Sequence, residues 1–231
     1  MNDTLQRLIM LTFFSLSIAA DQPPKPEISI ASKWESKYVS EGRNNLPDGG
    51  LATLEAAAAW INIALSTWIV TGTRENYQEL QFTTEYSNAI SNIEFYTAFT
   101  RLQFPADDAS DNELSAGLAF AGLPDITPAI DYVFSTGASG GFLEISLSSE
   151  QPMLEGMLTA TPYILQAFDF GYASESFNGY NNFQLGLEVA MPFNETFGLA
   201  GSVAHSIAMD DVEKENLGNV SWFTIGLTGS F

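Results

Sequence analysis

Carboxylates set at alternate positions are the residues of this chain best placed to do chemistry. Between residues 183 and 193, Phe183, Leu185 and Leu187 alternate with Gln184 and Glu188. Successive side chains of a β-strand point to opposite faces, so this pattern gives one apolar face and one polar face that carries the carboxylate. The same alternation occurs in 79–86, 113–120 and 143–148. Carboxylates on such a face can attract cations or coordinate a metal ion, depending on what the strands bring together.

Enzyme chemistry and metal binding have little support in the residue types. The chain has no cysteine and one histidine, which removes thiolate chemistry and imidazole metal clusters. His205 precedes Ser206, but adjacent strand residues face opposite ways, and Ser202 also lies on the opposite face. The acidic loops "PADDASD" (105–111) and "MDDVEKEN" (209–216) lack the spacing of a twelve-residue calcium loop. We therefore expect a protein that is not an enzyme, with no cofactor and no metal.

Composition limits the partners and favours one folded domain. Hydrophobic residues make up 45% of the 231 residues and charged residues 16%, so there is enough apolar surface to drive folding. Eight Lys and Arg stand against 28 Asp and Glu, a formal net charge of −20. Such a surface repels phosphates, which excludes nucleic acid as a partner.

The first 20 residues have the features of a cleaved signal peptide. A short polar start that ends at Arg7 precedes an apolar stretch over 8–18, with the small residues Ser17 and Ala19 after it. The apolar stretch is shorter than the ~20 residues that a spanning helix needs. We expect export, with residues 21–231 forming the mature domain.

The mature chain repeats about ten residues of alternation followed by a turn, which predicts antiparallel strands. Connections after odd-numbered strands are mostly longer and often charged, and those after even-numbered strands are mostly shorter. An even number of strands with this loop asymmetry is typical of an all-β, closed, up-and-down transmembrane β-barrel. The twelve predicted strands span 27–40, 50–59, 61–71, 77–86, 92–104, 112–120, 126–135, 141–149, 155–172, 180–191, 196–208 and 219–231.

Residues 51–70, "LATLEAAAAWINIALSTWIV", permit a competing interpretation as a transmembrane helix. Glu55, Asn62 and Ser66 would then lie in hydrocarbon. As a hairpin that turns near Trp60, the segment points Glu55 into an aqueous interior. We favour the hairpin.

Alternation alone does not decide whether the apolar face points outward or inward. A soluble ligand-binding barrel points it inward and a membrane barrel points it outward. The polar set is too rich in small and acidic residues for a ligand pocket or a soluble exterior, which favours the membrane. Aromatic residues near the strand ends are expected in two interfacial girdles: Trp34, Tyr38, Trp60, Tyr77, Tyr86, Phe120, Tyr132, Tyr172, Tyr180 and Trp222.

The last strand must close the sheet against the first, because an open edge in hydrocarbon leaves backbone groups unpaired. Its apolar face carries Phe223, Ile225, Leu227 and the terminal Phe231, with Gly229 interrupting the series. This segment resembles the C-terminal signal of bacterial outer-membrane proteins. The resemblance implies that the barrel-assembly machinery recognises this segment and is a partner of the protein.

Two further stretches are similar to the TorF-type porin family. They are "SIASKWESKYVSEGRNN" (29–45), with a tyrosine near a strand end and an arginine in the loop, and "LAFAGLPDITPAIDYVFSTGASGGFLEISLS" (118–148), with a proline before a strand that ends in Asp-Tyr. The resemblance implies a small barrel in the bacterial outer membrane, in contact with its lipid, that acts as a pore.

The polar face of the predicted strands gives a candidate pore lining of eleven acids and two lysines. An open interior of this kind would favour small solutes or cations over anions. If the interior is filled, the barrel is a non-conducting structural or surface-display protein; a soluble periplasmic ligand-binding barrel is the third alternative. The predicted lining is Lys33, Glu35, Lys37, Glu55, Glu79, Glu85, Glu94, Glu113, Asp131, Glu144, Glu155, Asp169 and Glu188.

Overall fold

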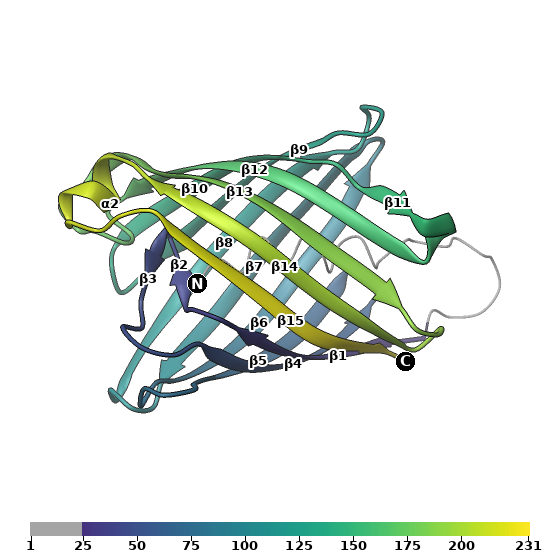
Figure 1. Ribbon diagram of the computed structural model, residues 1–231, viewed down its shortest axis with the longest axis horizontal. Helices are drawn as coiled ribbons and strands as arrows, with labels where there is room; N and C mark the ends of the chain where they lie inside the picture. Colours follow the sequence, from purple (N-terminus) through teal and green to yellow (C-terminus); the bar gives the residue numbers. More distant parts are fainter. Residues whose placement is uncertain (1–24) are drawn as a thin grey trace.

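A computed structural model describes residues 25–231 of the chain, so the expected signal peptide, residues 1–20, lies outside the described residues. Twelve antiparallel strands form a closed barrel with an up-and-down order (Figure 1). The strands are β1 (Glu27–Glu35), β4 (Leu51–Trp60), β5 (Ile63–Gly72), β6 (Gln78–Ile90), β7 (Ile93–Phe104), β8 (Ala109–Phe120), β9 (Thr127–Ser135), β10 (Gly140–Ser148), β12 (Leu158–Phe170), β13 (Asn178–Pro192), β14 (Phe197–Ala208) and β15 (Val220–Ser230).

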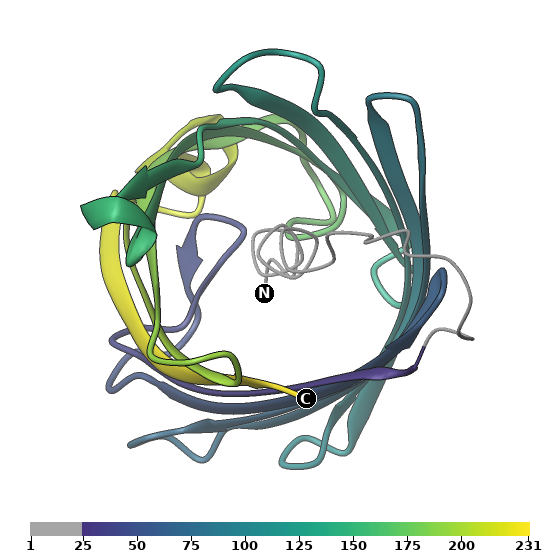
Figure 2. The ribbon, with the colours of Figure 1, turned by 90° about the vertical axis from the view of Figure 1, so that its right-hand side faces the viewer.

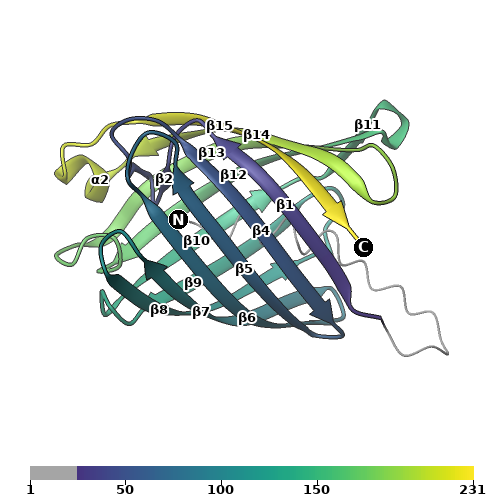
Figure 3. The same ribbon diagram turned by 90° about the horizontal axis from the view of Figure 1, so that it is seen from below.

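The first and last strands close the ring. β1 pairs with β4 on one edge and with β15 on the other, and Figure 3 shows it between them. At the end of this seam, the Ile28 N–H donates to the Phe231 carbonyl oxygen at 3.1 Å and the Phe231 N–H donates to the Ile28 carbonyl oxygen at 2.9 Å. The predicted closure of the last strand on the first is confirmed. It leaves the twelve-stranded wall without an open edge.

The two ends of the barrel differ. The chain reverses with two residues between β4 and β5 and between β6 and β7, where Ile61 and Ser91 take positive φ. This turn end also carries the short strand β11 (Gln151–Met153) and the 3-10 turn η1 (Leu154–Gly156). The opposite loop end carries the hairpin of β2 (Val39–Ser40) and β3 (Arg43–Asn44) and the helix α2 (Asp210–Lys214).

Most predicted strand bounds agree with the structure to within about three residues, with three corrections. The strand predicted over 77–86 continues to Ile90. The strand predicted over 27–40 ends at Glu35, because the chain then leaves the wall and turns inward as the β2–β3 hairpin. The strand predicted over 155–172 begins at Leu158. The three residues before Met157 form η1, in which Glu155 has φ 59° and is exposed.

Residues 51–70 form a hairpin, as expected, and not a helix. Glu55 of β4 lies opposite Trp68 of β5 in the register. Within residues 25–231, no helix has the length and apolar character to cross a lipid bilayer.

The outer face of the wall is apolar and exposed to the surroundings. Leu185, Leu187 and Val203 are exposed to 44, 37 and 55%, and the outward side chains of β15, Phe223, Ile225 and Leu227, to 46, 49 and 59%. The prediction that the apolar face of each strand points outward is therefore confirmed. An exposed apolar surface that runs around a whole barrel is unusual for a soluble protein and is typical of contact with lipid.

The aromatic girdle prediction is correct for some residues and wrong for four. Trp34, Trp60, Tyr86, Phe120, Tyr132 and Tyr180 are exposed on the outer surface. Tyr38 and Tyr77 instead pack with Trp68, Leu46, Leu51 and Val70 against the inner wall. Tyr172 packs in a second inner cluster with Phe142, Tyr163, Leu165, Ala167 and Val133. Trp222 faces inward and lines an internal cavity together with Lys33 and Gly226. Gly226 lies on the same strand as Trp222 and pairs with Lys33 of β1.

The first long loop, residues 36–50, folds into the barrel. Figure 2, which looks along the barrel axis, shows the β2–β3 hairpin inside the ring of strands. Tyr38, Leu46 and Leu51 are buried to 6% exposure or less, so burial of their apolar surface holds this loop against the wall. The loop narrows the lumen at the loop end.

Close packing on the inner face requires glycine at position 117. A Cβ atom there would lie 2.2 Å from Asp131 Oδ1 and 2.3 Å from Tyr96 Cε1. The Tyr96 hydroxyl donates to Asp131 Oδ1 at 2.8 Å across this glycine. The ring and the carboxylate therefore occupy the volume that any other side chain would need.

We expect G117V to destabilise the barrel by about 1 to 3 kcal/mol, because overpacking displaces the Tyr96 ring and its hydrogen bond. The measurement is the temperature at which folded, heat-modifiable migration is lost on a gel. G218V is the matched control, because a Cβ atom at Gly218 meets nothing within 4 Å. Equal unfolding temperatures for the two variants would contradict the packing argument.

Candidate functional site

The inner face of the barrel is the candidate site, and the strand register brings most of the predicted lining to it. Glu79 pairs with Val70 and Glu144 with Asp131 on this face. Lys37 instead lies half-buried in the loop after β1, and Glu155 lies in the exposed turn at the turn end. The inward residues that belong to barrel strands are Lys33, Glu35, Glu55, Glu79, Glu85, Glu94, Glu113, Asp131, Glu144, Asp169 and Glu188.

Glu155 was wrongly expected on the pore wall. The predicted strand included residues 155–157. The chain instead makes a tight 3-10 turn there, with positive φ at Leu154, Glu155 and Gly156. The wall strand starts after this turn.

Three of the inward acids accept hydrogen bonds from tyrosine hydroxyls. Tyr38 and Tyr77 donate to Glu79 Oε2, at 3.3 and 2.5 Å. Tyr172 donates to Glu113, and Tyr96 to Asp131. Burial, together with the nearby Glu79 carboxylate, raises the pKa of Tyr38 and of Tyr77, so both hydroxyls remain protonated donors. These acids are fixed in position on the wall.

Asp169 fixes the loop that follows β12. Its carboxylate accepts from the backbone N–H groups of Tyr172, Ala173 and Ser174, at 2.7, 3.2 and 2.8 Å. It is fully buried. Asp169 therefore shapes the lumen by holding residues 171–177 in a compact turn.

The inner wall carries few positive charges to balance its acids. Lys33 Nζ lies 3.5 Å from Glu55 Oε2 on the neighbouring strand. Glu35, Glu94 and Glu188 form no ion pair with a lysine or arginine among residues 25–231 within 4.0 Å. The electrostatic potential inside the described barrel is therefore set mainly by carboxylates.

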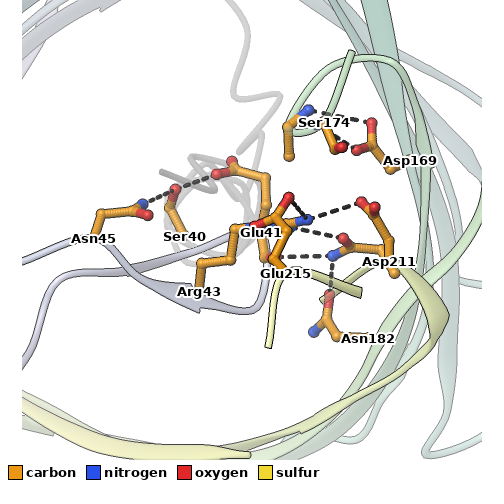
Figure 4. Close-up of polar contacts among 11 residues, drawn as sticks. Ser40, Glu41, Arg43, Asn45, Asp169, Ser174, Asn182, Asp211 and Glu215 are labelled. Atoms are coloured by element: carbon orange, nitrogen blue, oxygen red, sulfur yellow. Dashed lines mark hydrogen bonds and ion pairs between the residues drawn. The ribbon is translucent and has the colours of Figure 1, made fainter. Parts of the chain in front are cut away.

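Arg43 anchors the β2–β3 hairpin at the centre of the loop end (Figure 4). Its guanidinium donates to Asp211 Oδ2 at 2.8 Å, to Glu215 at 2.9 and 3.1 Å, to Asn181 Oδ1 at 2.8 Å and to the Glu41 carbonyl oxygen at 2.8 Å. All five N–H groups of the side chain are satisfied. Arg43 thereby links the hairpin to the helix α2 and to β13.

The backbone of the hairpin fits tightly against β13. Gly42 has φ +75°, and a Cβ atom there would lie 2.7 Å from the Asn182 Cγ atom. The Asn181 amide donates to the Glu41 carbonyl oxygen at 2.8 Å, and the Asn182 amide donates to Ser206 Oγ at 2.9 Å. The side of the hairpin that faces β13 is thus held by polar contacts, whereas its other side packs on the apolar cluster around Trp68.

A cavity remains between the hairpin and the wall of β12, β13, β14, β15 and β1. The volume open to the centres of water molecules is about 110 Å³. Charged residues at its boundary are Lys33, Glu35, Glu41 and Glu188, and the aromatic residues are Tyr163 and Trp222. The hairpin therefore narrows the lumen on this side without filling it.

The site contains residues that the sequence analysis did not assign to it. Trp222 could have been placed from the alternation of its own strand, because Phe223 and Ile225 on either side of Thr224 face outward. Arg43, Asn181 and Asp211 carried no comparable signal. Their contacts join segments 138 to 168 residues apart, and a loop has no period from which its contacts can be read.

The potential catalytic and metal-binding groups are not assembled. His205 faces outward, with its Nδ1 2.7 Å from Ser221 Oγ, while Ser206 faces inward and accepts from Asn182. In the described part of the chain, no three Asp, Glu or His side chains lie close enough together to hold a metal ion. The loop "MDDVEKEN" forms α2, and its acids Asp211 and Glu215 bind Arg43.

Solved structures of outer-membrane porins share this fold. The KdgM porin superposes with a TM-score of 0.62 at 11% identity, over 88% of this chain and 99% of that porin. The NanC porin gives 0.58 at 8% identity, over 87 and 98% of the two chains. An outer-membrane channel from Pseudomonas putida F1 gives 0.52 at 9% identity, over 94 and 98%. No protein-family model matches the chain, and no curated protein matches its sequence.

The burial of Asp211 in α2 predicts a pH dependence at the loop end. Burial raises the pKa of Asp211 from 3.8 to about 6; the nearby Asp169 adds to the rise and the Arg43 guanidinium opposes it. Between pH 3.8 and about pH 6, the Asp211 carboxyl keeps its proton while α2 is docked and loses it when α2 is undocked. Docking of α2 therefore weakens as the pH rises from about 4 to about 6, and is then constant.

Hydrogen exchange of residues 209–217, corrected for the intrinsic pH dependence of exchange, measures this effect. We expect protection in the wild type to fall between pH 4 and 6, and D211N to show no such fall. Protection that instead rises across this range would contradict the assigned pKa.

Proposed function

We propose that the protein is a porin-like channel of the bacterial outer membrane that passes small solutes and prefers cations. The observation that carries this proposal is the acidic inner face of a closed barrel whose outer face is apolar. Backbone groups of the twelve wall strands are paired around the ring, as a wall in hydrocarbon requires. The porin fold of KdgM and NanC supports the placement in the outer membrane.

Export and assembly are part of the proposal. We infer that residues 1–20 act as a cleaved signal peptide, and that the barrel-assembly machinery recognises the last strand through Phe223, Ile225, Leu227 and Phe231. The exposed side chains of this strand support the second inference, since they are available on the outer face.

The charge of the lumen argues against a polyanion as the cargo of this barrel. KdgM has been solved in complex with disordered oligogalacturonate, which is a polyanion. The inner wall of this chain carries Glu94 and Glu188 without a paired lysine or arginine among residues 25–231. Carboxylates along a confined path raise the local concentration of cations and repel anions. We therefore propose cations and small neutral molecules as cargo.

Selectivity tests this proposal directly. In a planar bilayer with a KCl gradient, we expect a reversal potential that corresponds to a few-fold higher permeability for K⁺ than for Cl⁻. E85Q/E94Q/E188Q should bring the permeability ratio close to one, since it removes three lumenal charges. The matched control E150Q/E155Q/E195Q removes three exposed acids at the turn end and should change the ratio less.

Two results would count against the proposal. Anion selectivity of the wild type would show that the carboxylates do not set the potential along the path. A folded barrel without conductance would favour the alternative of a non-conducting display protein, in which the hairpin closes the lumen.

The hairpin should limit the conductance, and Arg43 should hold it in place. R43Q leaves Asp211 and Glu215 without their cationic partner; loss of one partner of a buried ion pair costs about 3 to 5 kcal/mol. We expect a larger or noisier single-channel conductance as the hairpin becomes free to move.

R74Q is the matched control for this experiment. Arg74, in the loop after β5, pairs at 3.0 Å with Asp48, in the loop that carries the hairpin. Both side chains are more than 60% exposed, and such exposed pairs contribute about 0.2 to 1 kcal/mol to stability. Its conductance should match the wild type. An unchanged conductance in R43Q would show that the hairpin is not the constriction.

A further inference from the structure

The cavity beneath the hairpin is built into the wall by the choice of residue size. On the inner face of β14 and β15, the residues at its floor are small: Ala200, Ser202, Ala204 and Gly226. Larger residues at these positions would fill the space between the hairpin and the wall. The floor is therefore a recess in a closed wall and not a gap between strands.

Two cross-strand rows place the functional groups at opposite sides of the recess. In one row, Tyr163 pairs with Gly186, Gly186 with Ala204, and Ala204 with Trp222. In the adjacent row, Glu188 pairs with Ser202, Ser202 with Thr224, and Thr224 with Glu35. Each row thus has bulky groups at its ends and small groups between them. Strands lie about 4.8 Å apart, so each row spans roughly 14 Å along the wall.

The two carboxylates of this recess have no hydrogen-bond or ion-pair partner among residues 25–231. Glu35 is 6% exposed, and Glu188 is half-buried. Lys33 also borders the cavity, but its ammonium lies 3.5 Å from Glu55 on β4. A buried carboxylate without a partner is unfavourable, and a bound cation would relieve this cost. The recess is therefore suited to a positively charged ligand.

We propose that this recess is a binding subsite for a small organic cation with an ammonium group, of about the size of choline. The ammonium pairs with Glu188 and contacts the face of the Trp222 ring, Glu35 adds to the negative potential, and Tyr163 and Ser202 bound the rest of the ligand. A volume of about 110 Å³ has room for roughly seven to eleven water molecules, which matches a ligand with a similar number of heavy atoms.

Other ligand classes fit the recess less well. An anion would face Glu35, Glu41 and Glu188 around the cavity. A single metal ion needs several oxygen ligands within about 2 to 2.6 Å, whereas the two carboxylates belong to strands separated by β14 and β15. A neutral sugar could stack on Trp222 but would leave both carboxylates without an ion-pair partner among residues 25–231. The two acids and the aromatic ring together favour a small organic cation.

This subsite rests on the proposed channel function, since solutes reach it through the lumen, but it can be tested without any current. The experiment is titration of the full-length folded protein in detergent with choline chloride, followed by saturation-transfer NMR or calorimetry. We expect saturable binding to the wild type. E188Q and W222A should each weaken it by about tenfold, and W222F should retain most of it.

E195Q is the control, because Glu195 is an exposed acid between β13 and β14 that does not border this cavity. It should bind choline like the wild type. Heat-modifiable migration shows which variants are folded, and E188Q, which preserves side-chain shape, tests the site if W222A fails to assemble.

Three results would overturn the subsite: no choline binding to the folded wild type, equal binding to E188Q and the wild type, or equal loss of binding in E195Q and E188Q. If the barrel conducts but does not bind choline, only the proposed subsite is contradicted. If it binds choline but never conducts, the subsite stands and the proposed channel function is contradicted.

Discussion

Backbone hydrogen bonds between β1 and β15 close the twelve strands into a ring. Once Ile28 and Phe231 exchange backbone hydrogen bonds, every strand in the ring has a fixed register with two neighbours. Because side chains alternate along a strand, that register decides which side chains face inward. A shift of one residue would exchange the two faces and put carboxylates such as Glu188 outside and leucines inside. The acidic lumen and the apolar exterior are thus consequences of one pairing pattern.

Within this fixed wall, the lumen is shaped by two kinds of contact. Burial of Tyr38, Leu46 and Leu51 against Trp68 holds one side of the first loop, and the five hydrogen bonds of Arg43 hold the other. Apolar burial is not directional, whereas the planar guanidinium requires its partners in set positions. The combination gives the hairpin a defined place in the lumen. The recess in front of Trp222 exists because the hairpin stops short of the small residues on the inner face of β14 and β15.

The buried acids separate into structural and accessible groups. Glu79, Glu113 and Asp131 accept hydrogen bonds from tyrosine hydroxyls, and Asp169 accepts from three backbone N–H groups. These acids hold the inner wall and its loops in position. Glu35 and Glu188 border open space without such donors, so they are the groups through which the proposed channel would act on a passing cation. Acidic residues therefore have two roles in this barrel. Those that accept hydrogen bonds from the protein hold the structure, and Glu35 and Glu188, which do not, face the open space.

The strands, their number and their faces could be predicted from the sequence, because a period of two is a local property of neighbouring residues such as Phe183, Leu185 and Leu187. Most of the acids could also be assigned to the inner face, but the prediction for Glu155 was wrong because a tight turn interrupts the period there. The contents of the lumen could not be predicted in this way. Arg43 meets Asp211 across 168 residues, and Tyr38 and Tyr77 leave the expected girdle to pack inside. Such contacts depend on how the loops fold over a closed ring, and no local pattern in the sequence encodes that geometry.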